Sequence, residues 1–227
     1  MNLTDFKVLT FDVYGTLIDW ETGMVNGLKT LTDKMSRRIT RNEILEAHAH
    51  YESSTQLYTP TKVYSDTLAV VYKRLAEEWG IVVTWSDCLT YGASVKDWPA
   101  FKDSVEALQY LKHHFVLVVL SNIDNTSFVH SNKKLNVVFD AVYTAEDIGS
   151  YKPSQVNFDY MIENLERLGV KKTEILHTAE SMFHDHAPAN HCGLSNCWIY
   201  RRHGQEGFGA TMNPVSYTHL RAHETDS

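Results

Sequence analysis

The sequence predicts an α/β fold in which helices cover both faces of a parallel sheet. After Trp98 and Pro99, short apolar runs alternate with amphipathic helical segments. This alternation is typical of parallel strands joined by right-handed helical crossovers. An apolar run at residues 8–11 adds a first strand, and a long block with helical spacing follows it. Together these patterns predict a sheet core with an inserted helical subdomain.

The inserted block, residues 18–95, shows apolar side chains at helical spacing in two stretches, one around Leu28 and one around Val71. Residues 58–61, which include Pro60, interrupt the block between these stretches. Because no strand pattern occurs within it, we expect this insertion to be all-helical.

The sheet core is predicted to comprise residues 1–17 and 96–214. Within its second part we expect helices at 104–113, 127–135 and 156–168, the last closed by Gly169. The strands are expected at 115–120, 139–143, 175–178 and 197–200.

Composition excludes several classes of protein. The chain has 227 residues, 43% of them hydrophobic, which is enough to build a sizeable core. A net charge of −7 without a basic run argues against a nucleic-acid or anionic-membrane surface. Because the first residues lack a basic start and a long apolar stretch, we expect no signal peptide, and no apolar run is long enough to span a bilayer. Cys88, Cys192 and Cys197 form no CxxC pair, so we expect reduced thiols and a cytoplasmic location. The sequence leaves a homodimer open.

The C-terminal segment, residues 215–227, has neither helix nor strand periodicity and follows Pro214 abruptly. It resembles one reading frame through a sequencing adapter, so we expect it to be non-native and exclude it from the fold. The alternative is a disordered polar tail.

A carboxylate follows the first predicted strand. Asp12 comes directly after the apolar run, Gly15 permits a sharp turn, and Thr16 supplies a hydroxyl beyond it. Ligands of α/β sheets bind at the carboxyl ends of the strands. Asp12 is therefore a candidate nucleophile, and a helix N-cap is the alternative.

Further polar residues follow the other predicted strands. Tyr14 joins Asp12 and Thr16 after the first strand, and Ser121 and Asn122 follow the second. The other two candidates are Lys152, before a predicted helix, and Asp185, after the fourth strand. Carboxylates, hydroxyls, an amide and an ammonium at one sheet edge indicate covalent catalysis on a small anionic substrate. A solvated Lys152 is the alternative for that residue.

These four motifs resemble the haloacid dehalogenase superfamily, and within it the type II (S)-2-haloacid dehalogenases. The resemblance covers residues 7–214 and implies a Rossmann-like sheet core with an inserted helical cap. It also implies roles for individual residues. The catalytic group would be Asp12 as nucleophile, Thr16, Lys152 and Asp185, and the substrate would contact Tyr14, Ser121 and Asn122.

Tyr14 separates the branches of this superfamily. Phosphatases carry a second Asp at this position to protonate the leaving alkoxide, whereas halide leaves unprotonated. The resemblance therefore implies hydrolysis of a small 2-halocarboxylate through an aspartyl ester, without metal or other cofactor. Simple packing is the alternative role for Tyr14. The alternative functions are a phosphatase or other hydrolase of the superfamily and a catalytically silent binding protein.

Several positions depart from the pattern of the 2-haloacid dehalogenases. Leu45 stands where these enzymes carry a cap arginine that handles halide, and Arg41 lies one helical turn earlier. Glu180 and Met182 replace a Ser and an Asn of the fourth motif. The histidines around Asp185 suggest a metal cluster, but adjacent residues cannot all face one ion without strain, so we expect none.

Overall fold

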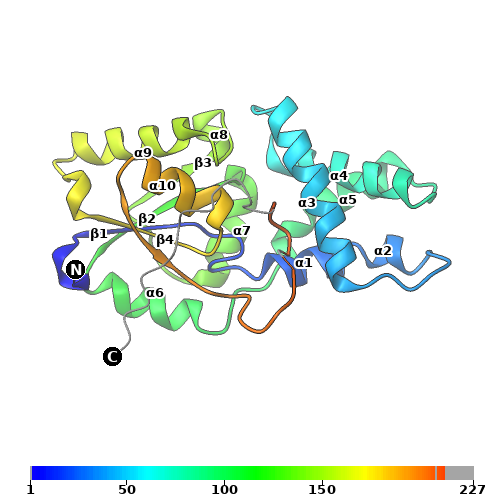
Figure 1. Cartoon of the computed structure of the whole chain (residues 1–227), viewed down its shortest axis with the longest axis horizontal. Helices are drawn as coiled ribbons and strands as arrows, with labels where there is room; N and C mark the ends of the chain where they lie inside the picture. Colours follow the sequence, from blue (N-terminus) through cyan, green and yellow to red (C-terminus); the bar gives the residue numbers. More distant parts are fainter. Residues whose placement is uncertain (1, 208, 213–227) are drawn as a thin grey trace.

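The computed structural model describes residues 2–207 and 209–212. Its centre is a parallel sheet of five strands in the order β3-β2-β1-β4-β5 (Figure 1). The strands are β1 (Val8–Phe11), β2 (Val116–Ser121), β3 (Ala141–Thr144), β4 (Ile175–Ala179) and β5 (Ser195–Trp198). The predicted α/β class with a parallel sheet is confirmed.

The first strand occupies the middle of the sheet because all four of its side chains are apolar or small enough to be buried on both faces. Phe11 is in register with Val119 of β2 and with Thr178 of β4. The carboxyl ends of these three strands therefore lie side by side, which brings the segments that follow them to one edge of the sheet.

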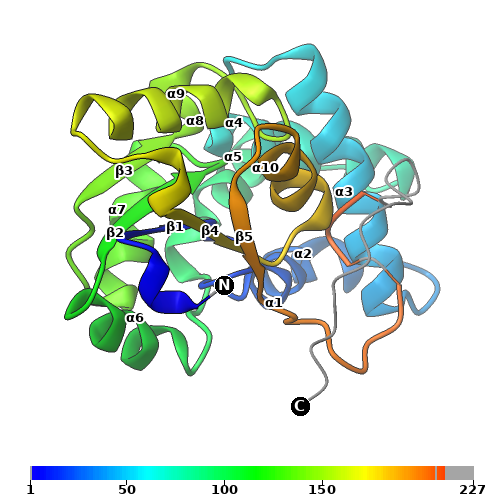
Figure 2. The same ribbon diagram turned by 60° about the vertical axis from the view of Figure 1, so that its left-hand side comes forward.

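Helices cover both faces of the sheet (Figure 2). Leu9 and Phe11 pack in one apolar cluster with residues of α6 and α7, whereas Val8 packs in a second cluster with residues of α9 and α10. This division follows from the alternation of side chains along a strand. The helices of the core are α6 (Ser104–Lys112), α7 (Asn125–Leu135), α8 (Ala145–Ile148), α9 (Gln155–Arg167) and α10 (Ala187–His191).

A block of helices follows β1 and lies beside the sheet (Figure 1). It contains α1 (Trp20–Gly27), α2 (Lys29–Thr32), α3 (Arg41–Tyr58), α4 (Tyr64–Glu78) and α5 (Trp85–Gly92). The segment with Pro60 separates α3 from α4, as the sequence predicts. Contacts between this block and the core include a hydrogen bond from the Ser65 amide to Asp124 Oδ2 at 3.1 Å and one from the Tyr151 hydroxyl to the Lys62 carbonyl. The subdomain boundaries at residues 18 and 95 stay a prediction.

The last strand differs from its predicted position. We expected it at 197–200, but β5 pairs Ser195–Trp198 with Leu176–Ala179 of β4. The strand lies at the sheet edge, where its side chains are only partly buried, so the apolar pattern does not mark its start. Tyr200 lies outside the strand and stacks on Trp198.

Two further features bear on the sequence predictions. Among the described residues, no helix is long and apolar enough to cross a membrane. Cys88, Cys192 and Cys197 are all free thiols. The predicted non-native tail, residues 215–227, lies outside the described residues.

Candidate active site

The strand ends and the helical block enclose a small cavity of about 30 Å³. Its core side comes from the segments after β1, β2 and β4 and from the loop before α9, and its other side comes from α1, α3 and α4. All seven sequence-predicted site residues except Thr16 line it directly, and Thr16 is hydrogen-bonded to one of them. The lining consists of Asp12, Tyr14, Trp20, Glu52, Gln56, Tyr64, Ser121, Asn122, Lys152, Ser181, His184 and Asp185.

Asp12 is held at the end of β1 by two side-chain donors. Lys152 Nζ donates to Asp12 Oδ1 at 3.0 Å, and the Thr16 hydroxyl donates to Oδ2 at 2.7 Å. Thr16 in turn accepts from the Glu180 amide at 2.9 Å, which ties the loop after β1 to the loop after β4. Glycine allows this turn because residue 15 has a φ of +95°, a backbone conformation that residues with a Cβ rarely adopt. The carboxylate is thus fixed in orientation.

Lys152 lies between two carboxylates. Besides Asp12 Oδ1, its ammonium donates to Asp185 Oδ1 at 2.6 Å and to the Leu120 carbonyl at 3.0 Å. A lysine has three N–H donors, so all are used within the protein. The side chain is 1% exposed, which rules out the solvated alternative.

The shared ammonium sets the charge of both acids. Burial raises the pKa of Asp12 to about 6, although the attraction of Lys152 opposes this shift. Burial would also raise the pKa of Asp185, but Lys152 and a hydrogen bond from His177 outweigh it and hold that pKa well below its usual range. Burial disfavours the charged lysine, yet the two carboxylates raise the pKa of Lys152. Near neutral pH the three groups are therefore all charged.

His177 is a contact of Asp185 that the sequence did not reveal. It is fully buried in β4, with Nε2 3.0 Å from Asp185 Oδ1 and Nδ1 2.9 Å from Thr10 Oγ1. Burial lowers the pKa of His177, so the neutral ring donates from Nε2 to the carboxylate and accepts from Thr10 at Nδ1. The signal available in the sequence was a histidine inside a predicted buried strand, which does not show what its ring contacts.

Ser121, the last residue of β2, and Asn122, which follows it, differ in what their side chains bind. The Asn122 side chain binds the backbone of Lys152. Asn122 Nδ2 donates to the Lys152 carbonyl at 2.9 Å, and Asn122 Oδ1 accepts from the Lys152 amide at 2.7 Å. Ser121 is 2% exposed, and its hydroxyl has no hydrogen-bonding partner among the described residues. Of these two side chains, the Ser121 hydroxyl is therefore the one that lines the cavity with an unused hydrogen-bond donor.

Tyr14 contributes its ring to the cavity while its hydroxyl is bound elsewhere. The hydroxyl lies 2.7 Å from Ser131 Oγ of α7, and the ring contacts Trp98 edge-on. Burial raises the pKa of this phenol well above its usual value, so it stays neutral. Tyr14 therefore does both things that the sequence analysis considered: its ring lines the cavity, and the residue also packs in the core.

The segment after β4 forms one turn of π-helix, Met182–His186, which places Asp185 beside Lys152. His184 lines the cavity, and its Nδ1 lies 3.2 Å from the Ser181 hydroxyl. Burial lowers the pKa of His184 to about 4, so its imidazole is neutral. His186 faces away and contacts Asn196 and the Ala179 carbonyl.

In the described part of the chain, no group of three or more His, Cys, Asp or Glu side chains is placed to hold an ion. The Lys152 ammonium contacts both Asp12 and Asp185. The position between them is thus already taken by a cation of the protein.

The helical block supplies polar groups that the sequence analysis missed. Glu52 and Gln56 lie one turn apart on the buried face of α3, and Gln56 Nε2 donates to Glu52 Oε1 at 3.2 Å. His48 Nδ1 lies 3.3 Å from Glu52 Oε2. The spacing of His48, Glu52 and Gln56 is the signal that was available, because three polar residues recur every four positions on a face otherwise buried.

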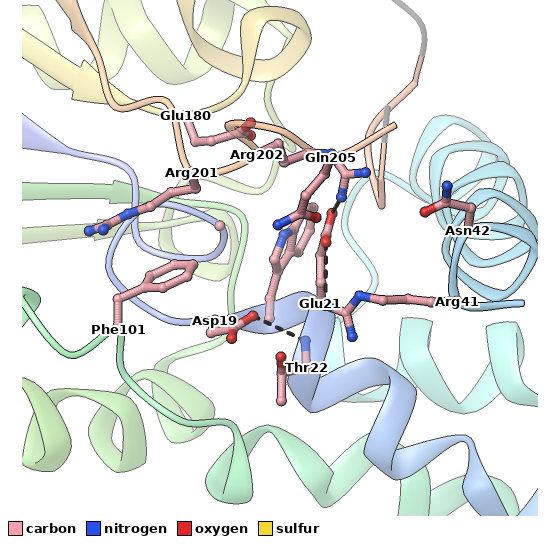
Figure 3. A pocket seen from close by; sticks show the side chains of 12 residues that line it. Asp19, Glu21, Thr22, Arg41, Asn42, Phe101, Glu180, Arg201, Arg202 and Gln205 are labelled. Atoms are coloured by element: carbon pink, nitrogen blue, oxygen red, sulfur yellow. Dashed lines mark hydrogen bonds and ion pairs between the residues drawn. The ribbon is translucent and has the colours of Figure 1, made fainter. Parts of the chain in front are cut away.

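A larger hollow of about 530 Å³ lies next to this cavity and shares Trp20 with it. Figure 3 shows Glu21 between the guanidinium groups of Arg41 and Arg202. Arg201 donates to Asp103 at 2.8 Å and to the Thr16 carbonyl at 2.9 Å. The arginines of this hollow are paired, and Arg201 braces the loop that carries Asp12.

Comparison with known proteins places the chain in a family. The model of the haloacid dehalogenase-like hydrolases matches residues 6–178. The chain belongs to this family. It is accordingly a hydrolase by family, and the predicted resemblance to the haloacid dehalogenase superfamily is confirmed. No curated protein matches the chain.

Solved structures with the same fold include different members of this superfamily. An L-2-haloacid dehalogenase has a TM-score of 0.74 at 18% identity, covering 92% of this chain and 91% of that one. The L-2-haloacid dehalogenase from Xanthobacter autotrophicus with chloropropionic acid covalently bound has a TM-score of 0.71 at 18% identity, with coverages of 86% and 78%. A HAD-hydrolase from Bacillus subtilis bound to magnesium has a TM-score of 0.72 at 16% identity, with coverages of 94% and 97%. At such identities the likeness shows the fold.

Proposed function

We propose that this hydrolase cleaves the carbon–halogen bond of a small 2-halocarboxylate through a covalent ester on Asp12. The observation that carries the proposal is the Lys152 ammonium held between Asp12 and Asp185. It supports an ionised nucleophile. The fold does not choose the reaction, because a magnesium-bound hydrolase resembles the chain about as closely as the dehalogenases do.

In the first step an oxygen of Asp12 attacks C2 of the substrate. A carbon–oxygen bond forms, the carbon–halogen bond breaks, and halide leaves with the bonding electrons. Halide needs no proton, which agrees with Tyr14, whose neutral hydroxyl is bound to Ser131 instead of facing a leaving group. The free Ser121 hydroxyl is the donor we assign to the substrate carboxylate.

In the second step water attacks the carbonyl carbon of the ester. The bond from this carbon to the substrate oxygen breaks, the product hydroxyl takes a proton, and Asp12 is restored. Two acceptors line the cavity for the proton of the water: the neutral His184 ring and Asp185 Oδ2, which has no partner among the described residues. We assign Lys152 to neutralising charge and Asn122 to positioning Lys152.

Two assays separate this proposal from its rivals. Purified protein is incubated with (S)-2-chloropropionate and with p-nitrophenyl phosphate, each in EDTA and in magnesium. We expect halide release at the same rate in both solutions. Magnesium-dependent phosphate release without halide release would make the chain a phosphatase, for which metal would screen the phosphate charge. Release of neither product would favour a silent binding protein. A cytoplasmic location belongs to this proposal and is read by cell fractionation.

A further inference from the structure

The charge of the cavity is at odds with a substrate that is only an anion. Three carboxylates line the cavity, those of Asp12, Glu52 and Asp185, whereas Lys152 is the one ammonium or guanidinium among its lining residues. Lys152 has no donor left for a ligand, as described above. A plain 2-halocarboxylate would therefore bring a further negative charge to a wall that is already negative.

Glu52 is the carboxylate that no fixed cation neutralises. It is 6% exposed, and in the described part of the chain no lysine or arginine lies within ion-pairing distance of it. Its neighbours are the Gln56 amide, the His48 ring and the Tyr64 hydroxyl. A buried carboxylate without a cation is costly, so a cation of the ligand would stabilise it.

The arginines of the helical block do not serve the cavity. Arg41 belongs to the neighbouring hollow and lies 3.5 Å from Glu21. Leu45, one turn from Arg41 on α3, is fully buried among apolar side chains. The side of the cavity formed by α3 thus presents an acid and an amide, and it favours a group that donates hydrogen bonds.

We infer that the substrate carries an ammonium group that binds Glu52 and Gln56, while its carboxylate faces Ser121. The inference rests on the proposed function for the position of the reacting carbon. It makes the substrate zwitterionic: a 2-halocarboxylate whose side chain ends in an amine. The two charges of such a molecule match the free Ser121 hydroxyl on the core side and the Glu52 carboxylate on the side of α3.

Two isosteric substrates test this inference near pH 7. (S)-3-amino-2-chloropropanoate and (S)-2-chlorobutanoate differ in an ammonium against a methyl group. We expect kcat/KM to be higher for the amine by on the order of tenfold or more, as for a hydrogen bond between charged groups. In Glu52→Gln the ratio should fall to about one. Glu46→Gln removes the same charge from an exposed position of α3 and should keep the ratio of the unchanged protein.

A binding measurement gives a second readout that needs no turnover. Calorimetric titration with 3-aminopropanoate and with butanoate compares the same two groups without a halogen. We expect 3-aminopropanoate to bind more tightly to the unchanged protein and to lose this advantage in Glu52→Gln. Equal binding, or a preference that survives in Glu52→Gln, would overturn the inference.

The outcomes for the two proposals are distinguishable. Halide release from both substrates with no preference for the amine would refute the ammonium site and leave the proposed function intact. A Glu52-dependent preference in binding, with no halide release from either substrate, would support the ammonium site and refute the dehalogenation. If Glu52→Gln does not fold, the comparison of amine and methyl ligands on the unchanged protein decides: equal kcat/KM and equal binding for the two would refute the ammonium site.

Discussion

Asp12 and Asp185 share one ammonium, and this arrangement governs the chemistry of the site at the scale of single residues. Lys152 keeps both acids charged near neutral pH, but the balance is uneven. Burial leaves the pKa of Asp12 raised to about 6, whereas Asp185, which also accepts from His177, has a pKa well below its usual range. The nucleophile is thus the acid that changes charge in the accessible pH range.

This difference predicts a pH profile. Only ionised Asp12 attacks carbon, and it loses its proton as the pH rises through about 6. We expect kcat/KM for halide release to rise about tenfold per pH unit below this value and to be level above it. Rates measured from pH 4.5 to 8 give the profile.

Glu180 provides the control for this profile. It lies outside the cavity, in the neighbouring hollow, and burial raises its pKa to about 7. In Glu180→Gln the pH profile of kcat/KM should still change slope near pH 6. A break that moves or disappears in this variant would assign the titration to Glu180 instead of Asp12.

Lys152 is also central to stability. Lys152→Met leaves two buried carboxylates without their cation, which typically costs about 3–5 kcal/mol. Their pKa values in the folded variant then exceed those in the unfolded chain, so the variant regains stability as the pH falls through the raised values. Urea unfolding of Lys152→Met should show a large loss of unfolding free energy, relative to the unchanged protein, at pH 8 and a smaller loss at pH 5. A loss that does not depend on pH would contradict this account.

The sequence could predict which residues meet at the strand ends but not how each is bound. Asp12, Ser121 and Asp185 were predictable because each lies at or beyond the end of a strand, and parallel strands end at one edge. Glu52 and His177 were not, because a polar residue on a helix or strand reveals its burial only after the packing is known. The pairing of Asn122 with the Lys152 backbone is likewise a product of tertiary structure.

At the scale of elements, the turn after β1 positions both donors of Asp12. Gly15 has φ +95°, and a Cβ at this position would lie 2.9 Å from Trp20 Nε1. Gly149 also has a positive φ, +73°, but a Cβ there would meet open space. Substituting both glycines therefore separates two contributions to the free energy of unfolding. Gly149 reports the backbone conformation alone, and Gly15 reports the conformation together with the clash with Trp20.

We expect Gly149→Ala to destabilise the fold by about 1–2 kcal/mol, the usual cost of this conformation for a residue with a Cβ. Gly15→Ala should cost more, because Trp20 must also move, and it should lower the rate of halide release by shifting Asp12. Urea unfolding of both variants gives the comparison. Equal losses would show that Trp20 yields without strain.

Element positions were predictable wherever apolar periodicity coincided with burial. The helix predicted to end at Gly169 is α9, which ends at Arg167, and Gly169 has φ +84°. The prediction failed at β5, where Ser195 and Asn196 belong to the strand although they are polar. Pairing with β4 decides this position, and such long-range hydrogen bonds leave no local pattern.

At the scale of the whole molecule, the sheet order places β1 between β2 and β4, so the three segments that carry the site come from distant parts of the chain. The cavity between sheet and helical block, about 30 Å³, has room for about one water molecule. A substrate with three or four carbons is larger than this space, so we expect its binding to displace side chains that line the cavity.

The central claim is that Asp12 forms a covalent ester, and a single turnover in ¹⁸O-labelled water tests it most directly. With enzyme in excess over (S)-2-chloropropionate, water attacks the Asp12 carbonyl and the product keeps an oxygen from the carboxylate. We predict unlabelled hydroxyl oxygen in the product, one ¹⁸O atom in the peptide that contains Asp12, and no halide release from Asp12→Asn. Label in the product of the first turnover, with an unlabelled Asp12, would show that water attacks the substrate directly and would contradict the account.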